Sequence, residues 1–178
     1  RARVTNFRQA RWYQPSSIAR GIHVICVHCP QYPENNQAAE RLAVYFATTD
    51  RKASTHAVVD NDSLWTCVRD GDVAYGASGM NRHGLHVEIA GYAQQSAAEW
   101  ADPFSEAAVR LAALWARGKA ELYAVPVTFL DAAALQAGKA GFTTHAEVEK
   151  AFPSTGHSDP GPNFPMTRFL GYVSFYVE

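Results

Sequence analysis

The apolar run at residues 22–27 constrains the fold of this chain more than any other stretch. It reads IHVICV, is nearly continuous in apolar residues, and is followed closely by Pro30 and Pro33. Runs of this kind are typical of strands that are buried on both faces of a sheet. We therefore expect a sheet with helices packed against both of its sides.

Three segments of the chain are predicted to be helices. Apolar side chains recur at helical spacing in residues 36–48 and again in residues 103–119, which form the longest predicted helix. Thr144 is placed to cap a third, short helix that begins near His145.

Further strands are predicted between the first two helices. Residues 55–60 and 64–68 are two short strands joined by a polar turn, and residues 85–90 alternate as a strand does. The hairpin must be antiparallel, whereas strands separated by helices commonly run parallel. The fold class that we predict is α/β, a single domain with a central mixed β-sheet flanked by helices.

The composition fits one globular domain and excludes two classes of partner. The 178 residues are 47% hydrophobic and 19% charged, with a formal net charge of −1. A nucleic-acid partner is not expected, because such proteins carry a surplus of Lys and Arg. Insertion into a membrane is not expected either, because no apolar run approaches the ~20 residues that span a bilayer.

The beginning of the chain predicts an arm and a modular context. Residues 1–20 are polar and hold five Arg, so we expect no signal peptide there but an arm lying across the domain. Residues 22–169 are then the core of the domain. Because the sequence opens with Arg1, we expect the domain to be excised from a longer modular protein.

The three cysteines are predicted to be structural. Cys26 and Cys29 have C-x-x-C spacing, but residues three apart on a strand point to opposite faces. Only Cys67 remains as a partner, which is too few for a four-cysteine zinc site. We expect three buried thiols.

Two histidines and an aspartate form a candidate zinc site. Residues 156–162 read GHSDPGP, a loop restricted by Pro and Gly, and they contain Asp159; His145 lies 14 residues upstream. His28 follows the first buried strand, where sites in α/β sheets collect. Catalytic zinc takes three protein ligands and keeps a position open for water. We predict that His28, His145 and Asp159 hold a Zn²⁺ ion.

Two more polar side chains are candidates for the catalytic site. His157 lies two residues before Asp159, so in an extended loop both side chains can face one point. Glu88 lies within a predicted strand whose apolar neighbours Val87 and Ile89 point the other way. A carboxylate aimed inward from a sheet is costly to bury unless it meets a cation or hydrogen bonds.

Other zinc patterns fit less well. The H-E-x-x-H pattern of many metalloproteases is absent. His145-Ala146-Glu147 matches the first half of a deaminase pattern, but no P-C-x-x-C follows. His83-x-x-His86 is interrupted by a glycine ahead of a strand. Each histidine taken alone is more often a hydrogen-bonded structural residue.

The order of these segments resembles the zinc-dependent N-acetylmuramoyl-L-alanine amidases of type 2. This family includes peptidoglycan recognition proteins and many phage endolysins. The resemblance runs from about residue 22 to residue 169, and its most specific part is the D-P-G-P segment with an upstream His. The resemblance is greatest to the amidase module of a phage endolysin.

The resemblance implies roles for individual residues. His28, His145 and Asp159 match the family's three metal ligands. Glu88 matches a glutamate that contacts the catalytic water, and His157 matches a position held by Lys or His. The implied activity is hydrolysis of the amide bond between N-acetylmuramic acid and L-alanine in peptidoglycan, leading to lysis of the bacterial wall.

The resemblance is incomplete in two loops that flank the expected groove. Some relatives have Tyr where this chain has Thr55, and others have His in the loop that reads Ala74-Tyr75-Gly76. Loop residues commonly bind substrate. The substrate-binding residues that we predict are Asn35, His56, Tyr75, Asn81 and His86.

Two other functions remain open at this stage. One is a peptidoglycan-binding domain without catalysis, and the other is a zinc peptidase that cuts within the stem peptide. We expect a monomer that is made in the host cytoplasm and reaches the cell wall at lysis.

Overall fold

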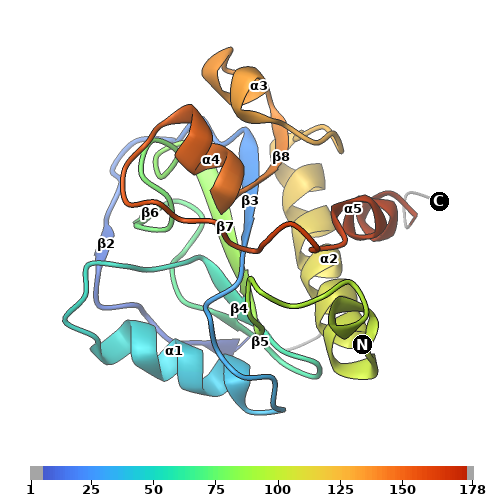
Figure 1. Ribbon diagram of the computed structural model, residues 1–178. Helices are drawn as coiled ribbons and strands as arrows, with labels where there is room; N and C mark the ends of the chain where they lie inside the picture. The colour runs from blue at the N-terminus through green and yellow to red at the C-terminus, as the bar shows by residue number, and fades with distance from the viewer. Residues whose placement is uncertain (1–5, 176–178) are drawn as a thin grey trace.

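A computed structural model describes residues 6–175 and shows a six-stranded sheet enclosed by helices (Figure 1). The strand order is β1-β5-β4-β7-β3-β8. The strands are β1 (Asn6–Phe7), β3 (Val24–His28), β4 (Ala57–Val59), β5 (Leu64–Thr66), β7 (Gly84–Ile89) and β8 (Gly141–Thr144). β3 runs parallel to both β7 and β8, and β4 is parallel to β7 but antiparallel to β5. The predicted mixed sheet and its hairpin are confirmed.

Helices cover both sides of the sheet, as the buried run of β3 requires. Helix α1 (Ala38–Thr48) packs on one side, and helices α2 (Pro103–Tyr123) and α5 (Met166–Ser174) pack together on the other (Figure 1). Ile25 and Val27 of β3 face α2 and α5 in the main core, while Val24 and Cys26 face the opposite side. Every residue of β3 is buried.

Two smaller helices pack against each other, and the second of them contacts β3 and β8. They are α3 (Ala132–Gln136) and α4 (His145–Ala151), and a short 3₁₀ turn, η1 (Glu99–Ala101), precedes α2. The hydroxyl of Thr144 accepts a hydrogen bond from the Glu147 amide, which confirms the predicted cap of α4. This cap fixes the point at which β8 ends and the helix begins.

The longest helix extends past its predicted end. It continues from residue 119 to Tyr123, because no helix-breaking residue occurs before Pro126. Ala124 adopts the left-handed conformation that ends helices. At the other end, the Asp102 carboxylate accepts a hydrogen bond from the Ser105 amide at 2.8 Å.

The arm contributes two short strands. β1 pairs with β5 at the sheet edge, and β2 (Tyr13–Gln14) forms a separate two-stranded sheet with β6 (Val73–Ala74). Residues 1–5 of the predicted arm lie outside the described residues.

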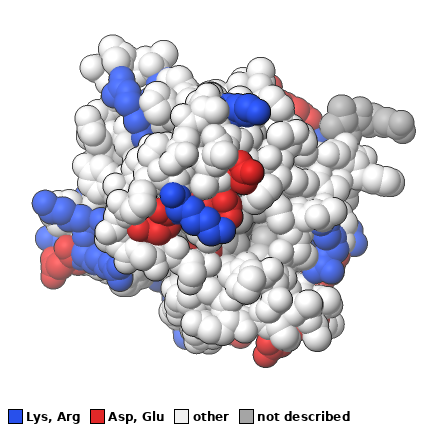
Figure 2. Space-filling model, turned by 45° about the horizontal axis from the view of Figure 1, so that its top comes forward, with Lys and Arg blue, Asp and Glu red and all other residues white. Residues whose placement is uncertain are grey.

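The cysteines and the surface agree with the composition. Cys26, Cys29 and Cys67 are free and buried, and burial raises the pKa of Cys67 to about 12. Figure 2 shows basic and acidic side chains interspersed on the face in view, as expected for a net charge of −1. Among residues 6–175, none of the helices has both the length and the apolar character needed to span a membrane.

Candidate metal centre

Three separate elements bring the predicted ligands together. His28 is the last residue of β3, and His145 is the first residue of α4. Val27 pairs with Thr144 across β3 and β8, so the register places the two histidines side by side. Asp159 follows α4 in the loop, and its carbonyl accepts a hydrogen bond from the Ala146 amide at 2.9 Å.

Gly161 holds the Asp159 loop against the body of the protein. Its φ is +92°, which L side chains rarely adopt, and an added Cβ would lie 1.9 Å from the carbonyl oxygen of Ala93. Only glycine permits this approach. The D-P-G-P segment therefore fixes the direction in which the Asp159 carboxylate points.

The donor atoms of the three residues converge on one point. His28 Nδ1 lies 3.1 Å from His145 Nδ1 and 3.3 Å from Asp159 Oδ2, and His145 Nδ1 lies 3.1 Å from Asp159 Oδ1. Ligands about 2.0–2.1 Å from a tetrahedral zinc ion are about 3.3 Å from one another. The set therefore fits a metal ion of this size with three protein ligands.

Burial prepares these groups to bind a cation. Burial lowers the pKa of His28, which favours the neutral imidazole that metals bind. Burial alone would raise the pKa of Asp159, but hydrogen bonds from His145 and His28 outweigh it and hold the pKa far below its ordinary value. The site therefore presents a neutral His28 imidazole and an ionised Asp159 carboxylate.

Glu88 lies on the same face as His28, directly across the pairing of β3 and β7. Its neighbours Val87 and Ile89 belong to the core on the opposite side of the sheet, as predicted. Glu88 Oε2 is buried and has no hydrogen-bond partner among residues 6–175. Burial, reinforced by the charge of Asp159, raises the pKa of Glu88. A cation or a bound water at the site would satisfy this carboxylate.

His157 lies at the solvent side of the ligand set. Its ring stacks on that of His145, with centroids 4.1 Å apart, and its Nδ1 lies 3.4 Å from Asp159 Oδ1. The side chain is 37% exposed, in contrast to the buried ligands. It is therefore accessible from the groove that the site opens onto.

The groove has a volume of about 840 Å³ and reaches Glu88, His145, His157 and Asp159. Of the predicted substrate-binding residues, Tyr75 and Asn81 line it. The side chain of Asn81 also shapes the groove wall, because its Oδ1 accepts hydrogen bonds from the amides of residues 76 and 77.

The other three predicted substrate-binding residues lie elsewhere. His56 and His86 are completely buried behind the site, and burial lowers the pKa of His56 to about 3. Asn35 is outside the groove lining, where its side chain closes a turn with Pro33 and Gln37. Strand alternation placed His86 on the correct face of β7 but did not indicate how deeply the neighbouring loop would cover it.

Much of the groove lining was missed by the sequence analysis, including its two basic residues. These residues are Arg51 and Lys52, whose exposed, positively charged side chains line the groove wall. Their only signal in the sequence is a pair of adjacent basic residues between α1 and β4, which is common on protein surfaces.

The fold and the site define an α/β protein with a buried group of side chains that could hold a metal ion and that opens onto a groove. A match to the N-acetylmuramoyl-L-alanine amidase family covers residues 19–162. The chain therefore belongs to the N-acetylmuramoyl-L-alanine amidase family. It is an enzyme that hydrolyses the amide bond between N-acetylmuramic acid and L-alanine in peptidoglycan. No curated protein sequence matches the chain significantly.

Solved structures share the fold at low sequence identity. AmpD, as a selenomethionine derivative, is 16% identical with a TM-score of 0.66, covering 96% of this chain and 94% of AmpD. The hydrolase AmiA of Staphylococcus aureus, in complex with its ligand, is 16% identical with a TM-score of 0.65, and the match covers 97% of this chain and 84% of AmiA. The N-acetylmuramoyl-L-alanine amidase LysC of Clostridium intestinale is 13% identical with a TM-score of 0.59, and the match covers 94% of this chain and 95% of LysC.

Proposed function

We propose that the amidase reaction runs at a zinc ion held by His28, His145 and Asp159. The observation that carries this proposal is the spacing of their donor atoms, 3.1–3.3 Å, at the inner end of the groove. Two nitrogen donors and one carboxylate form a ligand set that zinc hydrolases commonly use. When bound there, zinc polarises the scissile carbonyl and lowers the pKa of a water molecule toward ~7.

Glu88 is the proposed general base. It takes a proton from the attacking water as the water oxygen bonds to the carbonyl carbon, and it delivers the proton to the amine nitrogen as the C–N bond breaks. This leaves the lactyl carboxylate on the sugar and a free amino group on L-alanine. Two observations support this role: Glu88 Oε2 has no hydrogen-bond partner among the described residues, and Glu88 pairs with His28 across β3 and β7.

His157 is the proposed donor to the developing oxyanion. It is accessible from the groove, and its ring is held by stacking on His145. A ring N–H aimed at the carbonyl oxygen stabilises charge that exists only in the transition state, so it acts on kcat more than on binding.

The groove is the proposed binding site for the muramyl peptide. Tyr75 and Asn81 border it close to the site, and Arg51 and Lys52 offer positive charge to the carboxylates of a stem peptide. We also propose that the protein acts as a monomeric amidase of the phage-endolysin type, made in the host cytoplasm and released to the wall at lysis.

Digestion of purified peptidoglycan tests the proposal. We expect mass spectrometry to find intact stem peptides that begin with L-alanine, together with glycan strands that carry free lactyl groups. The Glu88→Gln variant serves as the matched control and should release neither product. Peptides cut between stem residues would instead identify a peptidase, and binding without any product would identify a non-catalytic domain.

A further inference from the structure

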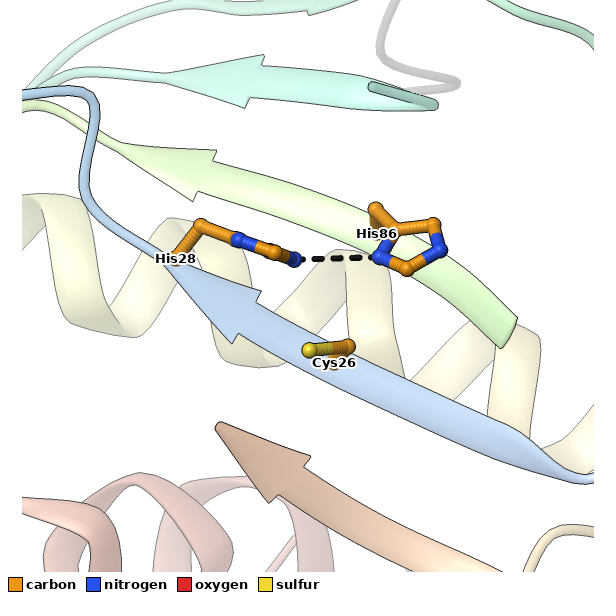
Figure 3. A group of neighbouring side chains, drawn as sticks. All are labelled: Cys26, His28 and His86. Atoms are coloured by element: carbon orange, nitrogen blue, oxygen red, sulfur yellow. Dashed lines mark hydrogen bonds between the residues drawn. The ribbon is translucent and has the colours of Figure 1, made fainter. Parts of the chain in front are cut away.

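A second cluster of metal-binding side chains lies directly behind the ligand set. Cys26, His28 and His86 place their donor atoms within 4.8 Å of one another, and all three are buried. Cys26 and His86 pair across β3 and β7, two residues before His28 and Glu88. Figure 3 shows the rings of His28 and His86 joined by a hydrogen bond, with Cys26 below them on β3.

His28 engages both of its ring nitrogens. Nδ1 faces His145 and Asp159, while Nε2 lies 3.0 Å from His86 Nδ1. A neutral imidazole has one nitrogen with a lone pair and one N–H. If Nδ1 binds a metal, Nε2 must carry the hydrogen, and His86 Nδ1 must accept it.

The fold holds His86 in the orientation that this acceptor role needs. Its backbone N–H donates to His56 Nδ1 at 3.1 Å, and the two rings stack with centroids 5.7 Å apart. Gly76 and Gly84 leave room for the ring, since a Cβ on Gly76 would lie 2.6 Å from His86 Cγ. The ring is completely buried, and its Nδ1 lies at hydrogen-bonding distance from His28 Nε2.

A second metal ion in this cluster is the competing explanation. It would need the lone pair of His28 Nε2, which the first metal site excludes, and a Cys26 thiolate. Cys26 is completely buried, where an unpaired thiolate is costly. The cluster is therefore better suited to support His28 than to bind a second ion.

We propose that His86 is a positioning residue for the metal centre: it accepts a hydrogen bond from His28 Nε2 and thereby fixes the tautomer that presents Nδ1 to the metal. This inference rests on the proposed metal site at His28, His145 and Asp159. Hydrogen bonds to the second nitrogen of a metal-binding histidine commonly change metal affinity by about 10–100-fold.

Two substitutions at the same position separate hydrogen bonding from packing. His86→Asn keeps an acceptor where Nδ1 lies, and His86→Leu fills the space without one. The zinc dissociation constant is measured by competition with a chelator, and the melting temperature of each zinc-free protein reports folding. We expect His86→Leu to weaken zinc binding about 10–100-fold, and His86→Asn to stay within about threefold of wild type. His23→Ala, a partly exposed histidine outside the cluster, is the control and should bind zinc normally.

The outcomes distinguish this inference from the proposed function. A wild-type protein that binds no zinc would overturn both. If the wild type binds one zinc ion per chain and His86→Leu binds zinc as tightly, only the positioning role is overturned. Two zinc ions per wild-type chain would also overturn only the positioning role. If His86→Leu does not fold, nitrogen NMR of zinc-loaded wild type decides the question. A hydrogen on His28 Nε2 is expected, and a hydrogen on Nδ1 would refute the proposal.

Discussion

Replacing Gly76 by alanine is predicted to damage the metal centre from a distance. The added Cβ would lie 2.6, 2.8 and 3.0 Å from three ring atoms of His86, whereas carbon atoms in contact prefer about 3.5–4.0 Å. The ring of His86 is completely buried and cannot swing into solvent. It must therefore move by about 1 Å, enough to break the 3.0 Å hydrogen bond to His28 Nε2.

The magnitude follows from these two effects. Overfilling a packed site costs about 1–3 kcal/mol, and the lost hydrogen bond costs about 1 kcal/mol more. A total of about 2–4 kcal/mol lowers the melting temperature of a domain of this size by on the order of 5–15 °C. Zinc affinity should fall as well, by about 10-fold or more.

Differential scanning calorimetry and chelator competition measure the two effects on one sample. Gly118→Ala is the matched control, because nothing lies within 4 Å of its added Cβ in the interior of helix α2. It should raise stability by about 0.5–1 kcal/mol and leave zinc binding unchanged. A Gly76→Ala protein with wild-type melting temperature and zinc affinity would refute the reasoning.

Three further predictions concern the proposed catalytic residues and the loop beside them. Glu88→Gln should lower kcat by about 10²–10⁴-fold while the zinc content stays at the wild-type level, because proton transfer is lost but the ligands are intact; wild-type turnover would exclude Glu88 as the base. His157→Ala should lower kcat by about 10²–10³-fold with little change in KM in steady-state assays on a muramyl peptide, and an unchanged kcat would remove its role. Glu149 accepts hydrogen bonds from the amides of Ser154 and Gly156, which hold its pKa at about 2 against an ordinary 4.5. The ionised carboxylate therefore stabilises the fold above pH 4.5, and this stabilisation is lost as the pH falls toward 2. In acid-unfolding curves, Glu149→Gln should lose less stability than the wild type between pH 4.5 and 2. Equal losses in the two proteins would contradict the lowered pKa of Glu149.

The parts of the fold that depend on local pattern could be predicted from the sequence. The apolar run at residues 22–27 identified β3 as buried on both faces, and Thr144 marked the start of α4. The convergence of His28, His145 and Asp159 also agrees with expectation, because His28 ends a buried strand and His145 begins a capped helix. Chain direction alone brings such positions to one edge of a parallel sheet.

The parts that depend on contacts between distant loops could not be predicted. Whether His86 contacts substrate or lies buried depends on how residues 71–82 fold over it, and the space beside Gly76 exists only in the assembled structure. Strand alternation assigns a side chain to a face of the sheet, but it does not say what covers that face. The same reason explains why Arg51 and Lys52 were missed, since only the folded chain brings them to the groove.

The proposed mechanism requires one ion to be held by three side chains from separate elements. The direct measurement is the zinc content per chain, after dialysis, of the wild-type protein and of Asp159→Ala. The account predicts one zinc ion for the wild type and a loss of most of it in the variant, with both apo proteins folded. Equal zinc contents in the two proteins, or none in the wild type, would contradict it.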